Sequence, residues 1–306
     1  MKILKKGIYK FDRVKDLVVS KNVLKFLEKD ASEIDRFRSR ILYHDNSLSN
    51  PQHMLICFDD RSVVPVSFHE FAESFSIIKG IAHYKFYDLN GNVKHDIRLS
   101  PAYLDGTFYV AIARLTPHRF FSITKHVLAN EIGFTHFSPE LTKFGKGKTF
   151  LKADKETTKQ MLSEPLIYGS ETKFSLLKKN CFIFGSNDGI AQLSTKDVTE
   201  RLKNSENAIS FIADEKIIGK KYKKKIPEII WAIKPGKKIN IRLNNKNSMI
   251  HLMNGVGLFN LRNKKVTLDI NKDFALNTLE DKNVEVKNLS ENNLIIHISN
   301  DFKVSN

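Results

Sequence analysis

Apolar positions along the chain follow two different rhythms. Residues 14–38, VKDLVVSKNVLKFLEKDASEIDRFR, place apolar side chains at mixed intervals of three and four, which predicts a helix. After Arg40 the pattern changes to short apolar runs separated by turn residues, such as HMLICF, SFSIIKG and FYVAIARL. Many short strands with little helix between them are typical of a β-sandwich or a β-barrel. The pattern therefore predicts a helix followed by an all-β fold.

The same strand rhythm returns in the C-terminal part of the chain. The dipeptide Asn90–Gly91 favours a tight hairpin in the first part, because a type I′ turn needs positive φ at both central residues. From Ile226 onward, runs such as KKINIRL and KKVTLDI alternate apolar and polar residues. The intervening sequence opens with a polar, Lys-rich stretch and reads as a connection. We therefore expect four segments: an N-terminal helical segment (1–40), a barrel (41–145), a connecting segment (146–225) and a second β domain (226–306).

Composition restricts the class of protein. Hydrophobic residues make up 41% of the 306 residues, and the 22 phenylalanines suggest bulky interior side chains. No stretch approaches the roughly 20 consecutive apolar residues that a membrane helix needs, and the N-terminus lacks the apolar run of a secretory signal. The two cysteines, Cys57 and Cys181, lie in apolar runs, which favours reduced, buried thiols. We expect a cytoplasmic protein without a membrane partner.

The chain carries a formal net charge of +16. Clustered basic residues can bind nucleic acid by releasing counterions from phosphate, and an anionic small molecule such as a nucleotide sugar is a further possible partner. Most of the excess is lysine spread along the chain, and the one dense run is KIIGKKYKKK at 216–225. Charge runs are usually solvated surface. We therefore favour a solvated loop and do not expect nucleic acid as the partner.

The stretch PVSFHEFAESFSIIKG, residues 65–80, carries the most specific candidate chemistry. It contains His69, Glu73 and Gly80 at a spacing that a metal-binding β-barrel would use. Ser67 lies two residues before His69, and strand alternation points both side chains to the same side. Glu73 has apolar residues on both sides, so its buried carboxylate needs a partner. His118 follows Pro117 later in the chain. Each histidine has an alternative interpretation as an ordinary hydrogen-bonded side chain.

These residues give the N-terminal half a resemblance to the cupins, and within them to the WbuC-like group found with bacterial surface-polysaccharide genes. The matching stretches are RSRILYHDN with His44, VPVSFHEFAESFSIIKG, YDLNGNVKHDIRLS, and TPHRFFSITKHVLANEIGFTHFSP with His118. They cover about residues 37–140. The resemblance implies a double-stranded β-helix, the cupin jelly roll. Together with the second half, which has no histidine pair, it implies an all-β bicupin, and we expect a homodimer.

The resemblance also implies a site in the first barrel. Its metal ligands would be His69, Glu73 and His118, with Ser67 where the family has a further histidine. A hydroxyl is a poor substitute for imidazole, so we expect a weakly held divalent metal (Zn, Fe, Ni or Mn) or none. His44 and Tyr109 would line the mouth of the pocket.

The activity that the resemblance implies is a sugar or nucleotide-sugar isomerase or epimerase of surface-polysaccharide (O-antigen or capsule) metabolism. His69 or His118 would act as the base and Tyr109 as the acid. Two alternatives remain. One is a metal-dependent oxygenase, which Ser67 disfavours. The other is a non-catalytic binding or regulatory module with a basic surface.

Overall fold

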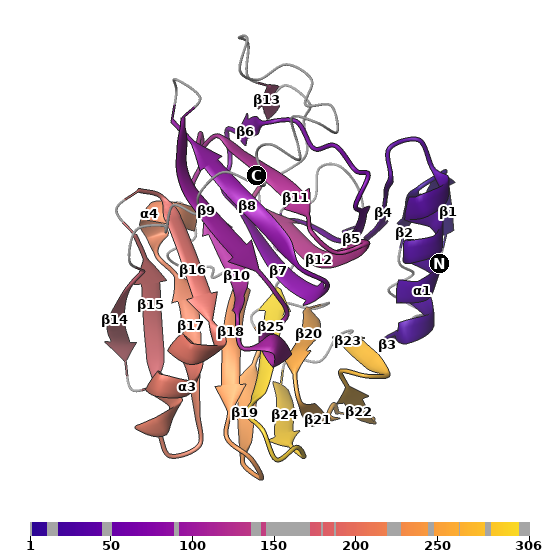
Figure 1. Ribbon diagram of the computed structural model, residues 1–306. Coiled ribbons are helices and arrows are strands. Elements are labelled where there is room, and N and C mark those ends of the chain that lie inside the picture. The colour runs from indigo at the N-terminus through magenta and orange to yellow at the C-terminus, as the bar shows by residue number, and fades with distance from the viewer. Residues whose placement is uncertain are drawn as a thin grey trace, which may run out of the picture.

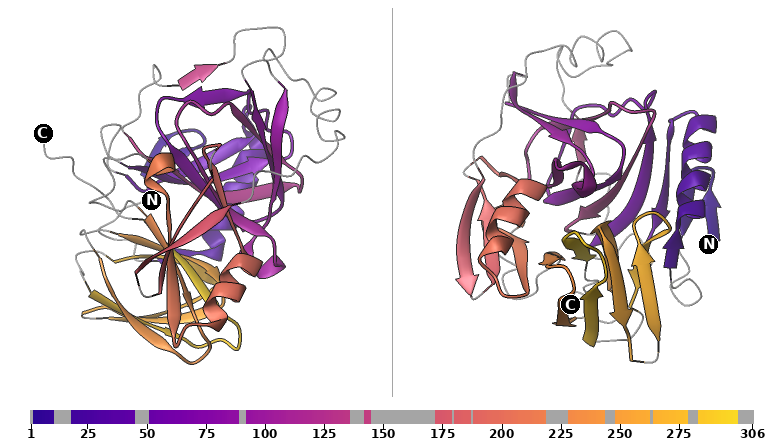
Figure 2. Two further views of the ribbon diagram at one scale, coloured as in Figure 1. Left: turned by 90° about the vertical axis from the view of Figure 1, so that its left-hand side faces the viewer. Right: turned by 60° about the horizontal axis from the view of Figure 1, so that its bottom comes forward.

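The computed structural model describes residues 2–10, 18–44, 51–88, 92–135, 142–144, 172–178, 180–186, 188–218, 228–243, 248–262, 264–278 and 283–299. Two large β-sheets, each built mostly from one half of the chain, lie against each other (Figure 1 and Figure 2). The predicted all-β architecture is confirmed.

The first sheet contains strands from the N-terminal half and one strand from the C-terminal half. In spatial order its strands are β1 (Lys2–Lys5), β2 (Ile8–Lys10), β4 (Arg38–Leu42), β5 (Gln52–Asp59), β12 (His126–Gly133), β7 (Glu73–Lys79), β10 (Thr107–Ile112), β9 (Val93–Leu99), β8 (Ala82–Tyr87), β11 (His118–Ser122), β6 (Ser67–His69) and β13 (Thr142–Phe144). Strand β16 (Ile190–Ser194) pairs with β10 beside this path.

The second sheet repeats this order with strands from the C-terminal half. Its strands are β14 (Lys173–Lys178), β15 (Cys181–Gly185), β17 (Ala208–Ala213), β18 (Glu228–Ile233), β25 (Leu294–Ser299), β20 (Met249–Asn254), β23 (Asp273–Asn277), β22 (Lys265–Asp269), β21 (Val256–Asn260), β24 (Asn283–Asn288) and β19 (Lys238–Arg242). Strand β3 (Val18–Ser20), from the N-terminal half, pairs with β23.

The two halves are therefore structural repeats that exchange a strand. Each begins with a hairpin (β1–β2 or β14–β15), continues through a strand given to the other sheet (β3 or β16), and then enters a helix. These helices are α1 (Lys21–Glu33) and α3 (Thr195–Lys203). The exchanged strands add to β23 and β10, which occupy matching places in the two sheet orders. The second repeat thus begins at β14, inside the segment expected as a connection, and β1 to β3 lie inside the expected helical segment.

Four apolar clusters fill the molecule. One fills the first barrel and includes Phe75, Tyr84 and Phe120, and another fills the second barrel. The remaining two lie between the repeats and combine side chains from both. Strand alternation explains the division, because successive side chains point to opposite faces. In β10, for example, Val110 belongs to the first barrel's interior, whereas Tyr109 belongs to a cluster between the repeats.

The helices are short and amphipathic. Leu24, Leu27 and Ala31 of α1 are buried, so the predicted helix is confirmed over Lys21–Glu33. At the start of α3, Ser194 accepts from the backbone N–H of Asp197, whose carboxylate accepts from the backbone N–H of Ser194, a capping box that starts the helix directly after β16. The other helices within the described ranges are a 3₁₀ turn (Ala102–Leu104) and α4 (Glu215–Ile218). No helix in the described part of the chain combines the length and apolar character needed to cross a lipid bilayer.

Two sequence expectations fall partly outside the described residues. Strands β8 and β9 pair as an antiparallel hairpin, but the Asn90–Gly91 turn itself is not described. The Lys-rich run is described only up to Ile218. Gly80 directly follows β7 with φ +85°, and an added Cβ would lie 2.2 Å from the carbonyl oxygen of His126. A glycine at this motif position is therefore required by the turn.

Candidate metal site in the first barrel

Three side chains singled out in the sequence converge at one end of the first barrel. His69 ends β6, Glu73 begins β7 and His118 begins β11. Nε2 of His118 lies 2.8 Å from Oε1 of Glu73, and Nε2 of His69 lies 3.6 Å from Oε2. One ligand atom from each residue lies within 4.8 Å of the other two. The site offers two imidazole nitrogens and one carboxylate to a single ion.

Neighbouring groups fix the orientation of these side chains. Nδ1 of His118 donates to the carbonyl oxygen of Thr116 over 2.8 Å, which directs Nε2 toward Glu73. The ring of His69 stacks on Phe71 with a centroid distance of 4.9 Å. Such outer contacts set the tautomer and the ring plane that a metal ligand needs. Both imidazoles are held with Nε2 directed at the carboxylate.

The carboxylate of Glu73 stays charged although its residue is only 3% exposed. Burial raises the pKa of Glu73, but the imidazoles of His69 and His118 and a 3.4 Å hydrogen bond donated by the Tyr84 hydroxyl lower it to about 2. Burial lowers the pKa of His69. Burial also acts to lower the pKa of His118, but Glu73 outweighs it and the pKa is raised. With Nδ1 already donating to Thr116, Nε2 of His118 faces Glu73, where a metal cation would compete with a proton.

This donor set fits a divalent transition metal. Imidazole nitrogen and carboxylate oxygen are the ligands such ions take in proteins, and the carbonyl of Thr116 leaves Nε2 of His118 for the metal. Ser67 is the register partner of His118 in the β6–β11 pair and lies two residues from His69 on the same strand. It therefore shares their face of the sheet. The three-ligand set is the only such cluster among the residues that the structure describes.

A second group of charged side chains lines the same barrel interior. Arg38 and Arg40 of β4 pair with Phe58 and Ile56, which belong to the interior cluster. Directly opposed residues of an antiparallel pair lie on the same face. Burial, then the charge of Glu73, raises the pKa of Glu131 to about 7, although both arginines act to lower it. Two guanidinium groups and a second carboxyl group therefore lie near the triad.

Arg38 has a buried hydrogen-bond donor without an acceptor in the described part of the chain. Burial lowers its pKa, and the nearby charge of Arg40 lowers it further. Its Nε atom is buried and has no hydrogen-bond partner within the described ranges. A buried donor without an acceptor is costly. The barrel therefore presents an N–H group suited to an anionic oxygen.

The other residues predicted from the sequence lie elsewhere. The hydroxyl of Tyr109 donates to Glu228 of β18, in the buried region between the repeats. Nδ1 of His44 lies 2.9 Å from the carbonyl oxygen of His53. Neither contact leads to the triad. The tyrosine that reaches Glu73 is Tyr84 instead, because it faces the interior of the first barrel.

Sequence reasoning gave no role to Tyr84, Arg38, Arg40 or Glu131. The sequence could have indicated that Glu131 points into the barrel, because it alternates in phase with Val127 and Ala129 on β12, and both of these are interior residues. Arg38 and Arg40 flank Ser39, whose hydroxyl donates to the carbonyl oxygen of Leu27 in α1. The phase of β4 cannot be assigned before the position of α1 is known.

Comparisons with known proteins identify the fold. A family model described as a domain of unknown function (DUF6016) matches residues 19–99. No curated protein matches the chain. A variant of salicylate 1,2-dioxygenase from Pseudoaminobacter salicylatoxidans superposes with a TM-score of 0.56 at 12% identity, over 92% of this chain and 84% of that chain. Another variant of that enzyme, in complex with gentisate, gives 0.56 at 11% identity, over 93% and 83%.

A variant of oxalate decarboxylase from Bacillus subtilis is also similar, with a TM-score of 0.46 at 14% identity over 87% of this chain and 74% of that chain. At such identities the likeness to the dioxygenase concerns the fold alone. The chain has the fold of a bicupin, with two double-stranded β-helices in one polypeptide.

Proposed function

We propose that the first barrel holds one divalent metal on His69, Glu73 and His118 and acts there on a small anionic molecule. The observation that carries the proposal is the convergence of three ligand atoms within 4.8 Å, with Glu73 and His118 buried and His69 partly buried. A buried carboxylate between two imidazoles is costly to build unless it is used. When bound, the metal would supply a Lewis acid that polarises a carbonyl or phosphoryl oxygen.

Arg38 and Arg40 support an anionic substrate. A guanidinium group binds carboxylate or phosphate through parallel N–H donors, and Nε of Arg38 lacks a partner in the described residues. Nucleotide sugars, sugar phosphates and sugar acids all carry such a group. This agrees with the sugar or nucleotide sugar that the WbuC-like resemblance implies. A role in surface-polysaccharide metabolism remains part of the proposal.

Proton transfer next to a carbonyl is the reaction that these side chains favour. The lone pair that His69 or His118 would use as a base is the one that binds the metal, so the two roles exclude each other. Glu131 is the remaining carboxyl group near the triad, and its pKa of about 7 suits a general base at neutral pH. Tyr84, and not Tyr109, is the tyrosine whose hydroxyl lies at the triad, where it donates to Glu73.

The experiment follows proton exchange directly. The metal-loaded protein is incubated in D₂O with a panel of keto and aldo sugar phosphates, sugar acids and nucleotide sugars. Proton NMR then records loss of the C–H signal next to the carbonyl. Exchange is expected with the wild-type protein and is expected to be lost in Glu131→Gln. Loss of exchange in Glu131→Gln with metal binding retained would assign the proton transfer to Glu131.

Two further variants complete the test. Arg38→Met should raise the KM for the anionic substrate, because it removes the N–H donors and keeps most of the apolar stem. Arg242→Met, on the exposed face of β19 in the second sheet, is the matched control and should change nothing. The proposal fails if wild-type protein exchanges no proton of any compound in the panel. A saturable binding signal without exchange would favour the non-catalytic binding module.

A further inference from the structure

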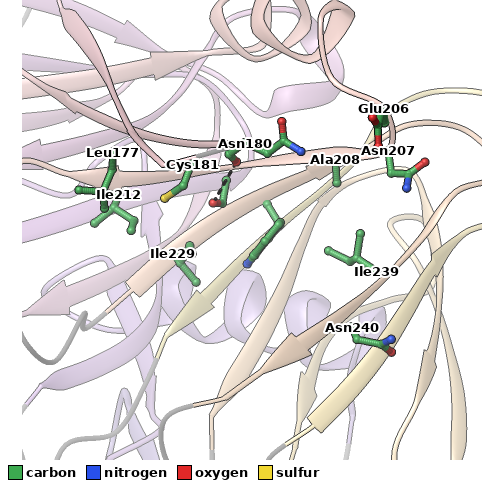
Figure 3. A pocket seen from close by; sticks show the side chains of 12 residues that line it. Leu177, Asn180, Cys181, Glu206, Asn207, Ala208, Ile212, Ile229, Ile239 and Asn240 are labelled. Carbon is green, nitrogen blue, oxygen red and sulfur yellow. Dashed lines mark hydrogen bonds between the residues drawn. The ribbon is translucent and has the colours of Figure 1, made fainter.

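The second repeat contains a cavity that the first-barrel chemistry does not use. It has a volume of about 420 Å³ and is lined by strands β14, β15, β17, β18 and β19 and by the residues that precede β17. Figure 3 shows the side chains of Asn180, Asn207 and Asn240 around this cavity, with Ile212, Ile229 and Ile239 among its apolar neighbours. It is therefore an amphipathic pocket formed by several elements.

The cavity belongs to the second barrel and not to the surface between the repeats. Trp231 and Ile229 of β18 line it and pack against the interior cluster of the second barrel. Ile230 and Ala232, on the opposite face of the same strand, belong to a cluster between the repeats. Alternation along β18 thus separates the pocket from the interface.

The polar lining is neutral apart from one carboxylate. Three asparagine amides and the hydroxyl of Ser210 contribute donors and acceptors, and Glu206 contributes a carboxylate. Among the residues that the structure describes, no lysine or arginine lines the cavity, although the chain as a whole has a net charge of +16. This described lining offers an anionic ligand no cation, and it includes the carboxylate of Glu206. The lining therefore favours an uncharged ligand with several hydrogen-bonding groups.

Trp231 supplies the apolar surface that such a ligand needs. It is the only tryptophan in the chain, and it lines the cavity beside Ile229 and Ile239. Its indole Nε1 is buried and has no acceptor among the described residues. An aromatic ring with an apolar body and one polar edge is a favoured anchor at binding sites.

We propose that this pocket binds a neutral sugar ring. A pyranose has one face of C–H groups, which packs on an indole, and a rim of hydroxyls, which donate to and accept from asparagine amides. This combination matches the pocket, whereas a phosphate, a carboxylate or a purely apolar molecule matches only part of it. The site is separate from the metal site, so it does not depend on the function proposed for the first barrel.

The single tryptophan makes the test direct. Emission of Trp231 is recorded while the full-length protein is titrated with methyl glucoside, methyl galactoside, methyl mannoside and N-acetylglucosamine. At least one is expected to give a saturable change in the millimolar range or tighter. Asn240→Ala should weaken that binding about three- to tenfold, the effect of one hydrogen bond. Asn271→Ala, in the exposed turn after β22, is the matched control and should bind like wild type.

Three outcomes would overturn the proposal. One is no change in emission with any neutral sugar, and a second is a response only to sugar phosphates, sugar acids or nucleobases. The third is unchanged affinity in both Asn240→Ala and Trp231→Ala, with the latter measured by calorimetry. His69→Ala should keep the sugar response while losing metal, which distinguishes this site from the first barrel.

Discussion

The two barrels have the same strand order and contrasting interiors. In the first barrel, the interior face of β12 carries the apolar residues Val127 and Ala129 and then the carboxyl group of Glu131. In the second, the corresponding strand β25 contributes Leu294, Ile296 and Ile298 to a wholly apolar cluster. Strand β11 begins with His118, whereas its counterpart β24 places Val284 and Val286 inside. Equal topology therefore supports a cluster of ionisable side chains inside one barrel and an apolar cluster inside the other.

The largest expected effect comes from opening the apolar core of the second barrel. Phe259 is fully buried in that cluster. Phe259→Ala should lower the free energy of unfolding by about 3–5 kcal/mol, because it leaves a cavity in a close-packed core. Chemical denaturation measures this change, and metal binding by the folded variant should match wild type. A loss below about 1 kcal/mol would mean that the second interior is less tightly packed than described.

Removing the carboxylate of Glu73, which lies between His69 and His118, should remove most of the metal binding that distinguishes the first barrel from the second. Glu73→Gln keeps the shape of the side chain but leaves only two imidazole ligands. Divalent metal should bind about 100-fold more weakly or worse, since the loss of even an outer partner costs 10–100-fold. Calorimetry with Zn²⁺ or Mn²⁺ measures the change, and Glu285→Gln in the second sheet is the control. Equal affinity in Glu73→Gln would exclude this carboxylate from the metal site.

The triad should also differ from the region between the repeats, where His251 packs against His53, in how buried histidines respond to acid. Burial lowers the pKa of His251 well below its ordinary value, and no carboxylate opposes this. Its protonation therefore favours the unfolded chain. Stability from the neutral ring is fully present above about pH 6.5 and falls by up to about 1.4 kcal/mol per pH unit below it.

His251→Phe should flatten that part of the stability profile between pH 7 and pH 5, measured by denaturation at each pH. A profile with the same slope as wild type would show that His251 does not carry this dependence. The wild-type protein is the reference at each pH, so a uniform shift from altered packing is separated from a change in slope.

The smallest expected effect is a gain. Ser67→His should tighten the binding of a divalent metal about three- to tenfold. Position 67 faces His118 across the β6–β11 pair, and an imidazole there would supply a fourth protein ligand, which suits such ions. Ser62→His, in the turn after β5, should leave affinity unchanged. If calorimetry finds no gain, position 67 does not reach the metal, and the ligand set is complete without it.

Short-range patterns predicted much of the first barrel. The strand rhythm, the helix over Lys21–Glu33 and the triad of His69, Glu73 and His118 all follow from local spacing or from the resemblance. The strand exchange does not follow from local spacing. The partner of β3 is β23, which lies more than half the chain away, and the partner of β16 is β10, which lies several strands earlier. Tyr109 was expected to line the mouth of the pocket, but its phase in β10 directs it to Glu228. Which face of a strand lies inward depends on long-range packing, which short-range periodicity does not encode.

The exchange of β3 and β16 has a consequence for synthesis on the ribosome. Residues 18–20 leave the exit tunnel roughly 250 residues before their partners in residues 273–276 are made, an interval of about 13–50 s at bacterial and eukaryotic rates. During that interval β3 has no sheet to join. The growing chain is then exposed to chaperones, and the second barrel can close only after its last strands have emerged.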